Sequence, residues 1–144
     1  MNSARRWLHA GVAWLFVLTI LVQVFLAGAA IANLGGSGDF SMHSGFGFAV
    51  VGLASLALLL TALIAGEGRG QVGLSFGLLV LYIVQTSLPS FRSTTPALAA
   101  LHPVNALLLF GLAVVVARRA LRAAREPDVA KAEARVGETT VDAV

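Results

Sequence analysis

Four long apolar runs constrain the fold of this chain more than any other feature. A helix needs about 20 apolar residues to cross the hydrocarbon core of a membrane, which is roughly 30 Å thick. Of all residues 58% are hydrophobic and only 12% are charged, whereas soluble domains carry about 25% charged residues. The sequence therefore predicts four membrane-spanning helices, at residues 7–32, 42–65, 71–88 and 96–117.

Short connections join these runs. The segment 33–41 is rich in glycine, and a second glycine-rich turn covers 66–70. Helices joined by short loops pack as antiparallel neighbours. We therefore expect an all-α integral membrane fold, an up-down-up-down four-helix transmembrane bundle within residues 1–125. The polar segment 126–144 is expected to begin as a frayed helical continuation and then to form a disordered cytoplasmic tail.

Basic residues gather at one end of this predicted bundle. Of the ten Lys and Arg residues, only Arg92 falls in a connection at the opposite end. Basic residues flanking membrane helices favour the cytoplasmic side, so we expect both termini to be cytoplasmic. The net charge of +3 follows from this rule. We therefore expect the lipid bilayer as a partner and no nucleic acid.

Polar side chains inside the runs converge at one depth. A helix rises 1.5 Å per residue, which places His43 within a turn of the outer end of its helix. His102 lies about two turns into the fourth helix, with Asn105 one turn deeper. Gln85 lies about one turn from the outer end of the third helix, and Gln23 lies some two to three turns from the outer end of the first. Unpaired polar groups in hydrocarbon cost a few kcal/mol each. A shared interior site explains their common depth.

The two histidines suggest a ligand for that site. In such a bundle the second and fourth helices lie diagonally, so His43 and His102 would face each other across the axis. Haem iron takes axial imidazoles on its two faces. We therefore predict a haem b site with His43 and His102 as metal ligands, Gln85 and Asn105 as donors that fix the imidazoles, and Arg92 near the propionates. Small residues would make room for the macrocycle: Gly45, Gly47, Ala49 and Gly52.

Simpler interpretations of the same residues stay open. The small residues are typical of close packing between membrane helices. His9, near Trp7 and Trp14, is expected to be an anchor at the membrane interface. The sequence is also compatible with a solvated His43, a His102 that caps backbone or bonds Asn105, interhelical bonds from Gln23 and Gln85, and a plain loop position for Arg92.

Three motifs carry a resemblance that covers residues 7–120. Met42-His43-x-Gly45 opens the second helix, Gln85 lies late in the third, and Leu101-His-Pro-Val-Asn-Ala106 opens the fourth. This layout resembles an uncharacterised family of small four-helix bacterial membrane proteins, and is similar to one four-helix half of haem A synthase. In that enzyme, histidines at the outer ends of the second and fourth helices of a half bind haem. The resemblance implies His43 and His102 as ligands and a bacterial plasma membrane as the location.

The chain also departs from haem A synthase. That family has a glutamate three residues before the second-helix histidine and an arginine after it, where this chain has Phe40 and Ser44. Its paired loop cysteines are missing, because the chain contains no cysteine. The resemblance therefore favours haem binding over oxidative chemistry, and we expect a membrane cytochrome rather than an enzyme.

Three functions remain as hypotheses. The first is a haem b protein that transfers electrons with a quinol or another membrane redox partner. The second is a non-catalytic accessory or assembly subunit, within a homo-oligomer or a larger membrane complex. The third is a small transporter or channel, which is disfavoured because no Asp, Glu, Lys or Arg lies within any predicted span.

Overall fold

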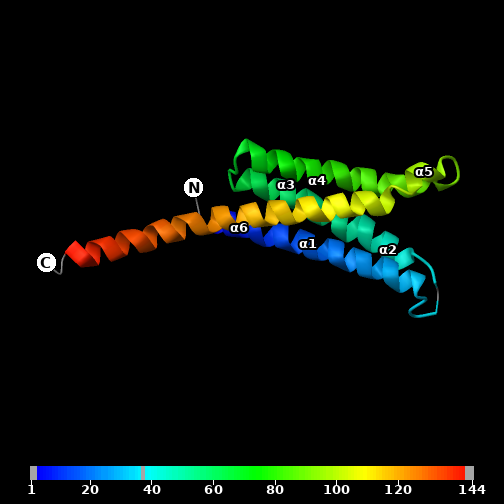
Figure 1. Ribbon diagram of the computed structural model, residues 1–144, viewed down its shortest axis with the longest axis horizontal. Coiled ribbons are helices and arrows are strands. Elements are labelled where there is room, and N and C mark those ends of the chain that lie inside the picture. The colour runs from blue at the N-terminus through cyan, green and yellow to red at the C-terminus, as the bar shows by residue number, and fades with distance from the viewer. Residues whose placement is uncertain (1–2, 37, 142–144) are drawn as a thin grey trace.

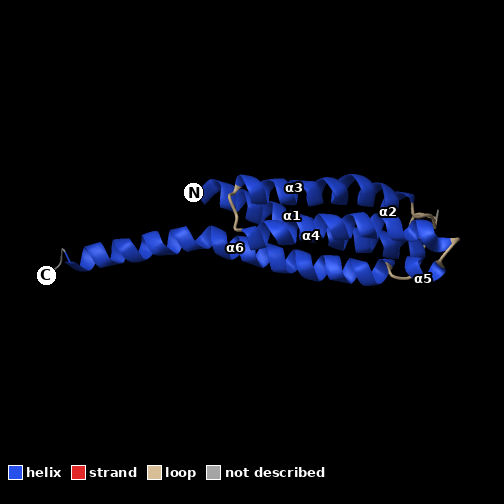
Figure 2. Ribbon diagram, turned by 90° about the horizontal axis from the view of Figure 1, so that it is seen from above, coloured by secondary structure: helices blue, strands red, loops and turns tan. Residues whose placement is uncertain are grey.

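Helices account for nearly all of the structure. The computed structural model describes residues 3–36 and 38–141, with the surroundings of side chains described as far as residue 126. Within this part, helices and short loops alternate (Figure 2). The elements are α1 (Ser3–Ile31), α2 (Ser41–Phe46), the π-helical η1 (Gly47–Val51), α3 (Gly52–Ile64), α4 (Arg69–Ser87), the 3₁₀-helical η2 (Leu88–Arg92), α5 (Pro96–Ala99) and α6 (His102–Val141).

The predicted spans are present. Within the described residues, four helical segments are long and apolar enough to cross a membrane, which gives the chain the character of a multi-pass membrane protein. They are Ser3–Ile31, Ser41–Ile64, Arg69–Arg92 and Pro96–Glu126, and are called here the first to fourth spans. Only 17–22% of the apolar stretch of each span is buried inside the molecule. Most of the apolar surface therefore faces outward, as a lipid environment requires.

The spans lie side by side (Figure 1). α1 packs against α3 and α6, and α4 packs against the same two helices, so α3 and α6 are diagonal to each other. The loop after α1 and the turn before α5 lie at one end of the bundle, called here the loop end; the N-terminus and the turn after α3 lie at the other, the terminal end. Toward the loop end the α1–α2 pair diverges from the α4–α5 pair (Figure 1).

The turn at the terminal end is built by local chemistry. Gly66 adopts a positive φ of 67°, which glycine does without steric cost. The Gly66 N–H donates to the Leu63 carbonyl, and the Glu67 N–H donates to the Ala62 carbonyl, both at 3.1 Å. These two bonds form a Schellman motif that satisfies the last carbonyls of α3.

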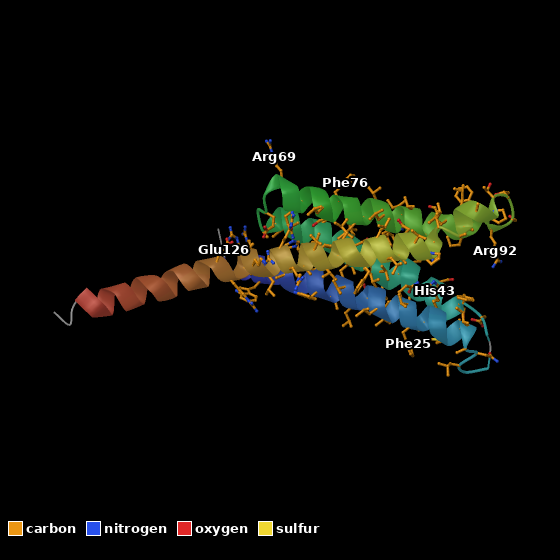
Figure 3. All side chains as sticks on the ribbon, viewed as in Figure 1. Phe25, His43, Arg69, Phe76, Arg92 and Glu126 are labelled. Carbon is orange, nitrogen blue, oxygen red and sulfur yellow. The ribbon has the colours of Figure 1, made fainter. Side chains whose placement is uncertain are left out.

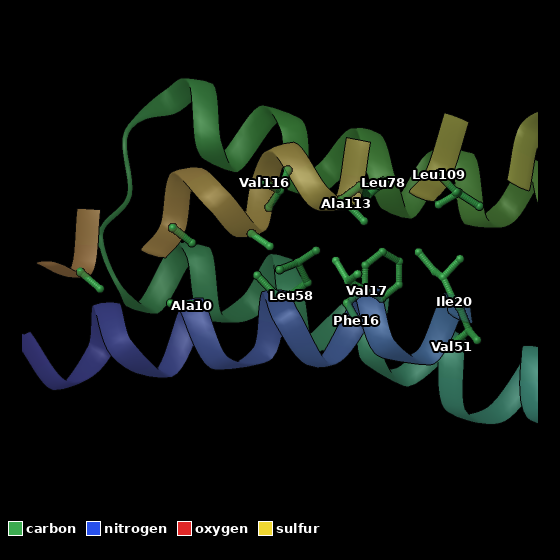
Figure 4. Close-up of a cluster of buried hydrophobic side chains, with 14 residues drawn as sticks. Ala10, Phe16, Val17, Ile20, Val51, Leu58, Leu78, Leu109, Ala113 and Val116 are labelled. Carbon is green, nitrogen blue, oxygen red and sulfur yellow. The ribbon is translucent and has the colours of Figure 1, made fainter. Parts of the chain in front are cut away.

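An apolar layer fills the middle of the bundle (Figure 4). Phe16, Leu58 and Leu78 are completely buried there. Phe16 lies between His9 and Gln23 in α1, and Leu78 lies between Gln71 and Gln85 in α4. In the second span, Leu58 lies between His43 and Thr61. Next to this layer, α1 and α6 meet through small side chains that allow close packing: Ala10, Ala13, Ala113, Ala117, Ala120 and Ala124.

Two details of the fourth span differ from expectation. The polar segment from Glu126, for which we predicted a frayed helical continuation before disorder, is helical as far as Val141, because alanine, glutamate, lysine and arginine are all good helix formers. Pro103 lies in the first turn of α6 rather than inside a longer helix, since a turn at Ala100 and Leu101 separates α5 from α6. Proline is well tolerated in a first turn, where its missing N–H would have no partner.

Candidate functional site

At the loop end, a histidine of α2 is hydrogen-bonded to a glutamine of α1. The Nδ1 atom of His43 in α2 lies 3.0 Å from the backbone carbonyl oxygen of Gln23 in α1. A carbonyl can only accept, so Nδ1 carries the proton and Nε2 of His43 is left as an acceptor. The side-chain Nε2 of Gln23 lies 3.2 Å from this atom and donates to the His43 carbonyl at 2.8 Å.

A histidine of α6 and a glutamine of α4 repeat this arrangement. The Nδ1 atom of His102 lies 3.0 Å from the Gln85 carbonyl oxygen, and the Gln85 Nε2 atom lies 3.1 Å from Nε2 of His102. By the same reasoning Nδ1 of His102 is the donor and Nε2 the acceptor. The first two spans form one helical hairpin and the last two form another. Both hairpins therefore contain the same histidine–glutamine contact, although the sequence alone shows no obvious repeat.

One residue breaks the equivalence. Asn105 is buried and donates from Nδ2 to Oε1 of Gln85 at 2.8 Å and to the Leu81 carbonyl at 3.0 Å. In the first hairpin, Phe46 occupies the corresponding place three residues after the histidine. The Oε1 atom of Gln23 is buried and has no hydrogen-bond partner within the described residues. The glutamine that contacts His102 is therefore held in place by Asn105, whereas the glutamine that contacts His43 has no such partner within the described residues.

The two pairs meet across the bundle. The imidazole rings of His43 and His102 lie with their centroids 6.2 Å apart and their planes at 67°. Phe40 contacts His43 edge to face, with centroids 5.8 Å apart. Both histidines are half-buried, and the labelled His43 side chain lies where the helical pairs diverge (Figure 3). We call His43, His102, Gln23, Gln85 and Asn105 together the histidine site.

Side chains of neighbouring helices pack against two of the glycines beside this site. A Cβ atom at Gly47 would lie 2.7 Å from Nε2 of Gln23, and one at Gly52 would lie 2.5 Å from the hydroxyl of Tyr82. Gly45 is exposed, with nothing near its Cβ position. The expectation that these glycines leave room for a macrocycle is therefore wrong for Gly47 and Gly52, because Gln23 and Tyr82 already occupy that room. Gly47 also begins η1, and π-helical turns are frequent at functional sites.

The predicted site residues divide into two groups. His43, His102, Gln85 and Asn105 come together as expected. Arg92 lies apart from them: it ends η2, is exposed, and makes none of their hydrogen bonds within the described part of the chain. Its side chain extends from the loop end (Figure 3).

Sequence reasoning missed a second polar cluster, at the terminal end. His9 is fully buried, so its predicted role as an anchor in contact with the membrane interface is wrong. Its Nδ1 atom lies 3.1 Å from the Thr61 hydroxyl oxygen, and its Nε2 atom lies 3.2 Å from Nε2 of Gln71. The same Gln71 nitrogen donates to the Val116 carbonyl at 3.0 Å. We call His9, Thr61 and Gln71 the His9 cluster; with Val116 it joins all four spans.

A pattern in the sequence could have revealed that His9 and Gln23 both point into the bundle. Positions 9, 13, 16, 20 and 23 recur at intervals of three and four residues, which places them on one face of α1. Three of them form the apolar core, namely Ala13, Phe16 and Ile20. His9 and Gln23 continue that buried face at its two ends, and the helical spacing therefore directs both side chains into the bundle.

Comparison with known proteins adds one match. Residues 23–91 match a family of unknown function, DUF6220. The matched stretch contains Gln23, His43 and Gln85 but ends before His102. No curated protein and no solved structure matches the chain, and no link to haem A synthase is found. Within the described residues, no group of three or more His, Cys, Asp or Glu side chains is placed to hold a metal ion.

Proposed function

We propose that this protein is a membrane cytochrome that holds one haem b between His43 and His102 and takes part in electron transfer. Its spans would cross the plasma membrane in alternating directions. Both termini would be cytoplasmic, because the arginines of the terminal end then obey the preference of basic residues for that side. The histidine site would lie near the outer surface, within reach of a quinol or another membrane redox partner.

The close approach of the two imidazoles carries this proposal. Their ring centroids lie 6.2 Å apart, edge to face. One ligand at this point would be within reach of both histidines, and imidazole nitrogens are common metal ligands. A macrocycle supplies four ligands of its own, so two histidines suffice without a third protein ligand. When bound, haem supplies a one-electron redox couple whose potential depends on its axial ligands.

The hydrogen bonds of the site support the same role. Histidines that bind metals commonly donate their second ring N–H to a backbone carbonyl, which fixes the tautomer and the ring orientation. His43 and His102 both do so, through the carbonyls of Gln23 and Gln85. Their Nε2 atoms would therefore be the ones to hold the haem. The glutamine amides now donate to these atoms and would have to turn aside on binding.

Absorption spectra of the detergent-purified protein test the proposal. We expect a near-stoichiometric Soret band, with sharp α and β bands after reduction, as for a six-coordinate haem. His43→Ala and His102→Ala should each lose or change this spectrum. His9→Ala is the matched control, because its imidazole is buried at the other end of the bundle, and it should keep the spectrum. A colourless protein made with ample haem supply would contradict the proposal, as would an unchanged spectrum in both single variants.

One observation favours a second candidate, a non-catalytic accessory or assembly subunit. Both ring nitrogens of His43 and of His102 already have partners inside the chain. The pairs could therefore act as structural clamps between helices, without any ligand. A colourless protein that co-purifies with a stoichiometric membrane partner would support this function instead.

A further inference from the structure

Four arginines line one face of α6 at the terminal end. Arg118, Arg119, Arg122 and Arg125 lie on the outer side of the helix, and none of them is buried. At 3.6 residues per turn they occupy about a third of the helix circumference. The opposite face carries the buried alanines that pack against α1, Ala117, Ala120 and Ala124. We call these four arginines the arginine face.

The arginine face has little negative charge near it. None of its four guanidinium groups makes a hydrogen bond or an ion pair with the described residues. At the same end, the described side chains include three more arginines, Arg5, Arg6 and Arg69, against two carboxylates, Glu67 and Glu126. Among the described side chains, this surface therefore carries an excess of positive charge, and the arginine face has no partner there.

A contact between helices fixes the depth of this face. The Arg6 Nη1 atom donates to the Ala123 carbonyl at 3.1 Å, so the start of α1 is level with the middle of the arginine face. Trp7, 41% exposed, follows Arg6, and tryptophan favours the membrane interface. Residues 118–125 span roughly 10 Å along the helix. The face therefore extends through the headgroup layer at the edge of the first and fourth spans.

We propose that the arginine face binds the phosphate groups of anionic phospholipids in the leaflet at the terminal end. Guanidinium groups bind phosphate oxygens through two parallel hydrogen bonds. Basic clusters beside a membrane helix attract anionic lipids. The long side chains of Arg118 and Arg119, the deeper pair, reach the headgroups by extending along the helix. Lipid is favoured over a soluble partner because the face begins within the fourth span. This site is independent of haem.

Tryptophan quenching in symmetric vesicles tests the proposal. The full chain has two tryptophans, Trp7 and Trp14, both near this end. Brominated phosphatidylglycerol and brominated phosphatidylcholine are compared at equal mole fraction in a phosphatidylcholine bilayer. We expect a relative affinity for the anionic lipid of at least about fivefold, given the charge of the site. Equal composition of both leaflets makes the direction of insertion irrelevant.

Two controls assign the preference to the arginine face. In Arg118→Gln/Arg119→Gln/Arg122→Gln/Arg125→Gln the relative affinity should fall toward one, whereas Arg92→Gln, at the loop end, should leave it unchanged. If the fourfold variant does not insert, wild-type protein in about 0.5 M salt gives the same answer, because salt screens exposed charges. Equal quenching by both lipids at low salt would overturn the proposal. So would a preference that survives both salt and the arginine substitutions.

Discussion

A Cβ atom added at Gly47 would lie 2.7 Å from the amide nitrogen of Gln23. That is closer than carbon and nitrogen can approach, so one of them must move. The Gln23 amide ends a flexible side chain and would turn away, releasing both the ring nitrogen and the carbonyl of His43. Glycine at this position therefore allows the first histidine–glutamine pair to form.

The first prediction concerns this contact. Gly47→Ala should lower the free energy of unfolding by about 1–2 kcal/mol, because interhelical hydrogen bonds in membranes are worth roughly that much. If haem binds at the site, the same variant should shift its spectrum. Gly45→Ala is the control, since nothing lies within 4 Å of its Cβ position. Equal effects of the two substitutions in detergent unfolding would refute this role of Gly47.

The second prediction concerns Gly52 and Tyr82. Gly52→Ala would place a methyl group 2.5 Å from the Tyr82 hydroxyl, which donates to the Phe48 carbonyl at 3.2 Å. The rigid ring must rotate out of place, so we expect a loss of about 1–3 kcal/mol of stability. Gly73→Ala meets no atom within 4 Å and should gain up to about 1 kcal/mol from helix propensity. Thermal denaturation should shift in opposite directions for the two variants.

The third prediction concerns the His9 cluster. Gln71→Leu removes the donor to His9 Nε2 and to the Val116 carbonyl. The buried ring nitrogen of His9 is then left without this partner, whereas the Val116 carbonyl keeps its bond within α6. We expect a loss of about 1–2 kcal/mol. Ser87→Ala is the control, because Ser87 lies near the other end of the bundle and its hydroxyl bonds only its own helix, through the Ile83 carbonyl. A Gln71→Leu protein as stable as the Ser87→Ala protein would show that the cluster does not hold the bundle together.

The fourth prediction tests the unequal support of the two histidines. Asn105→Leu leaves Oε1 of Gln85 without its donor and makes the second hairpin resemble the first. Stability should fall by about 1–2 kcal/mol, and the Gln85 amide should become mobile in side-chain NMR spectra. Thr86→Val, which removes only bonds to the helix's own backbone, should change neither quantity appreciably. Retained order of the Gln85 amide in Asn105→Leu would argue against the positioning role of Asn105.

The sequence predicted the spans and the residues of the site better than it predicted their contacts. Long apolar runs define membrane helices almost by themselves, because the bilayer sets their length. Depth along the helices was enough to bring His43, His102, Gln85 and Asn105 together. It could not show that Gln23 binds His43, since that contact depends on the close approach of helices that Gly47 allows.

The errors have equally physical causes. His9 was assigned to the interface because it lies near the chain terminus and two tryptophans, whereas its helical face decides its environment. The glycines of the second span were assigned to a ligand, but small residues also admit neighbouring side chains such as Gln23 and Tyr82. Local sequence does not distinguish these two uses.

The apolar layer of Phe16, Leu58 and Leu78 has an electrical consequence. It separates the histidine site from the His9 cluster, and the buried hydroxyls beside it donate only to carbonyls of their own helices: Thr19, Ser55 and Ser75. A charged group at the centre of a bilayer costs at least about 3 kcal/mol, so the layer acts as an insulator between the two faces of the membrane. Within the described residues, the layer therefore offers an ion no polar path between the histidine site and the His9 cluster.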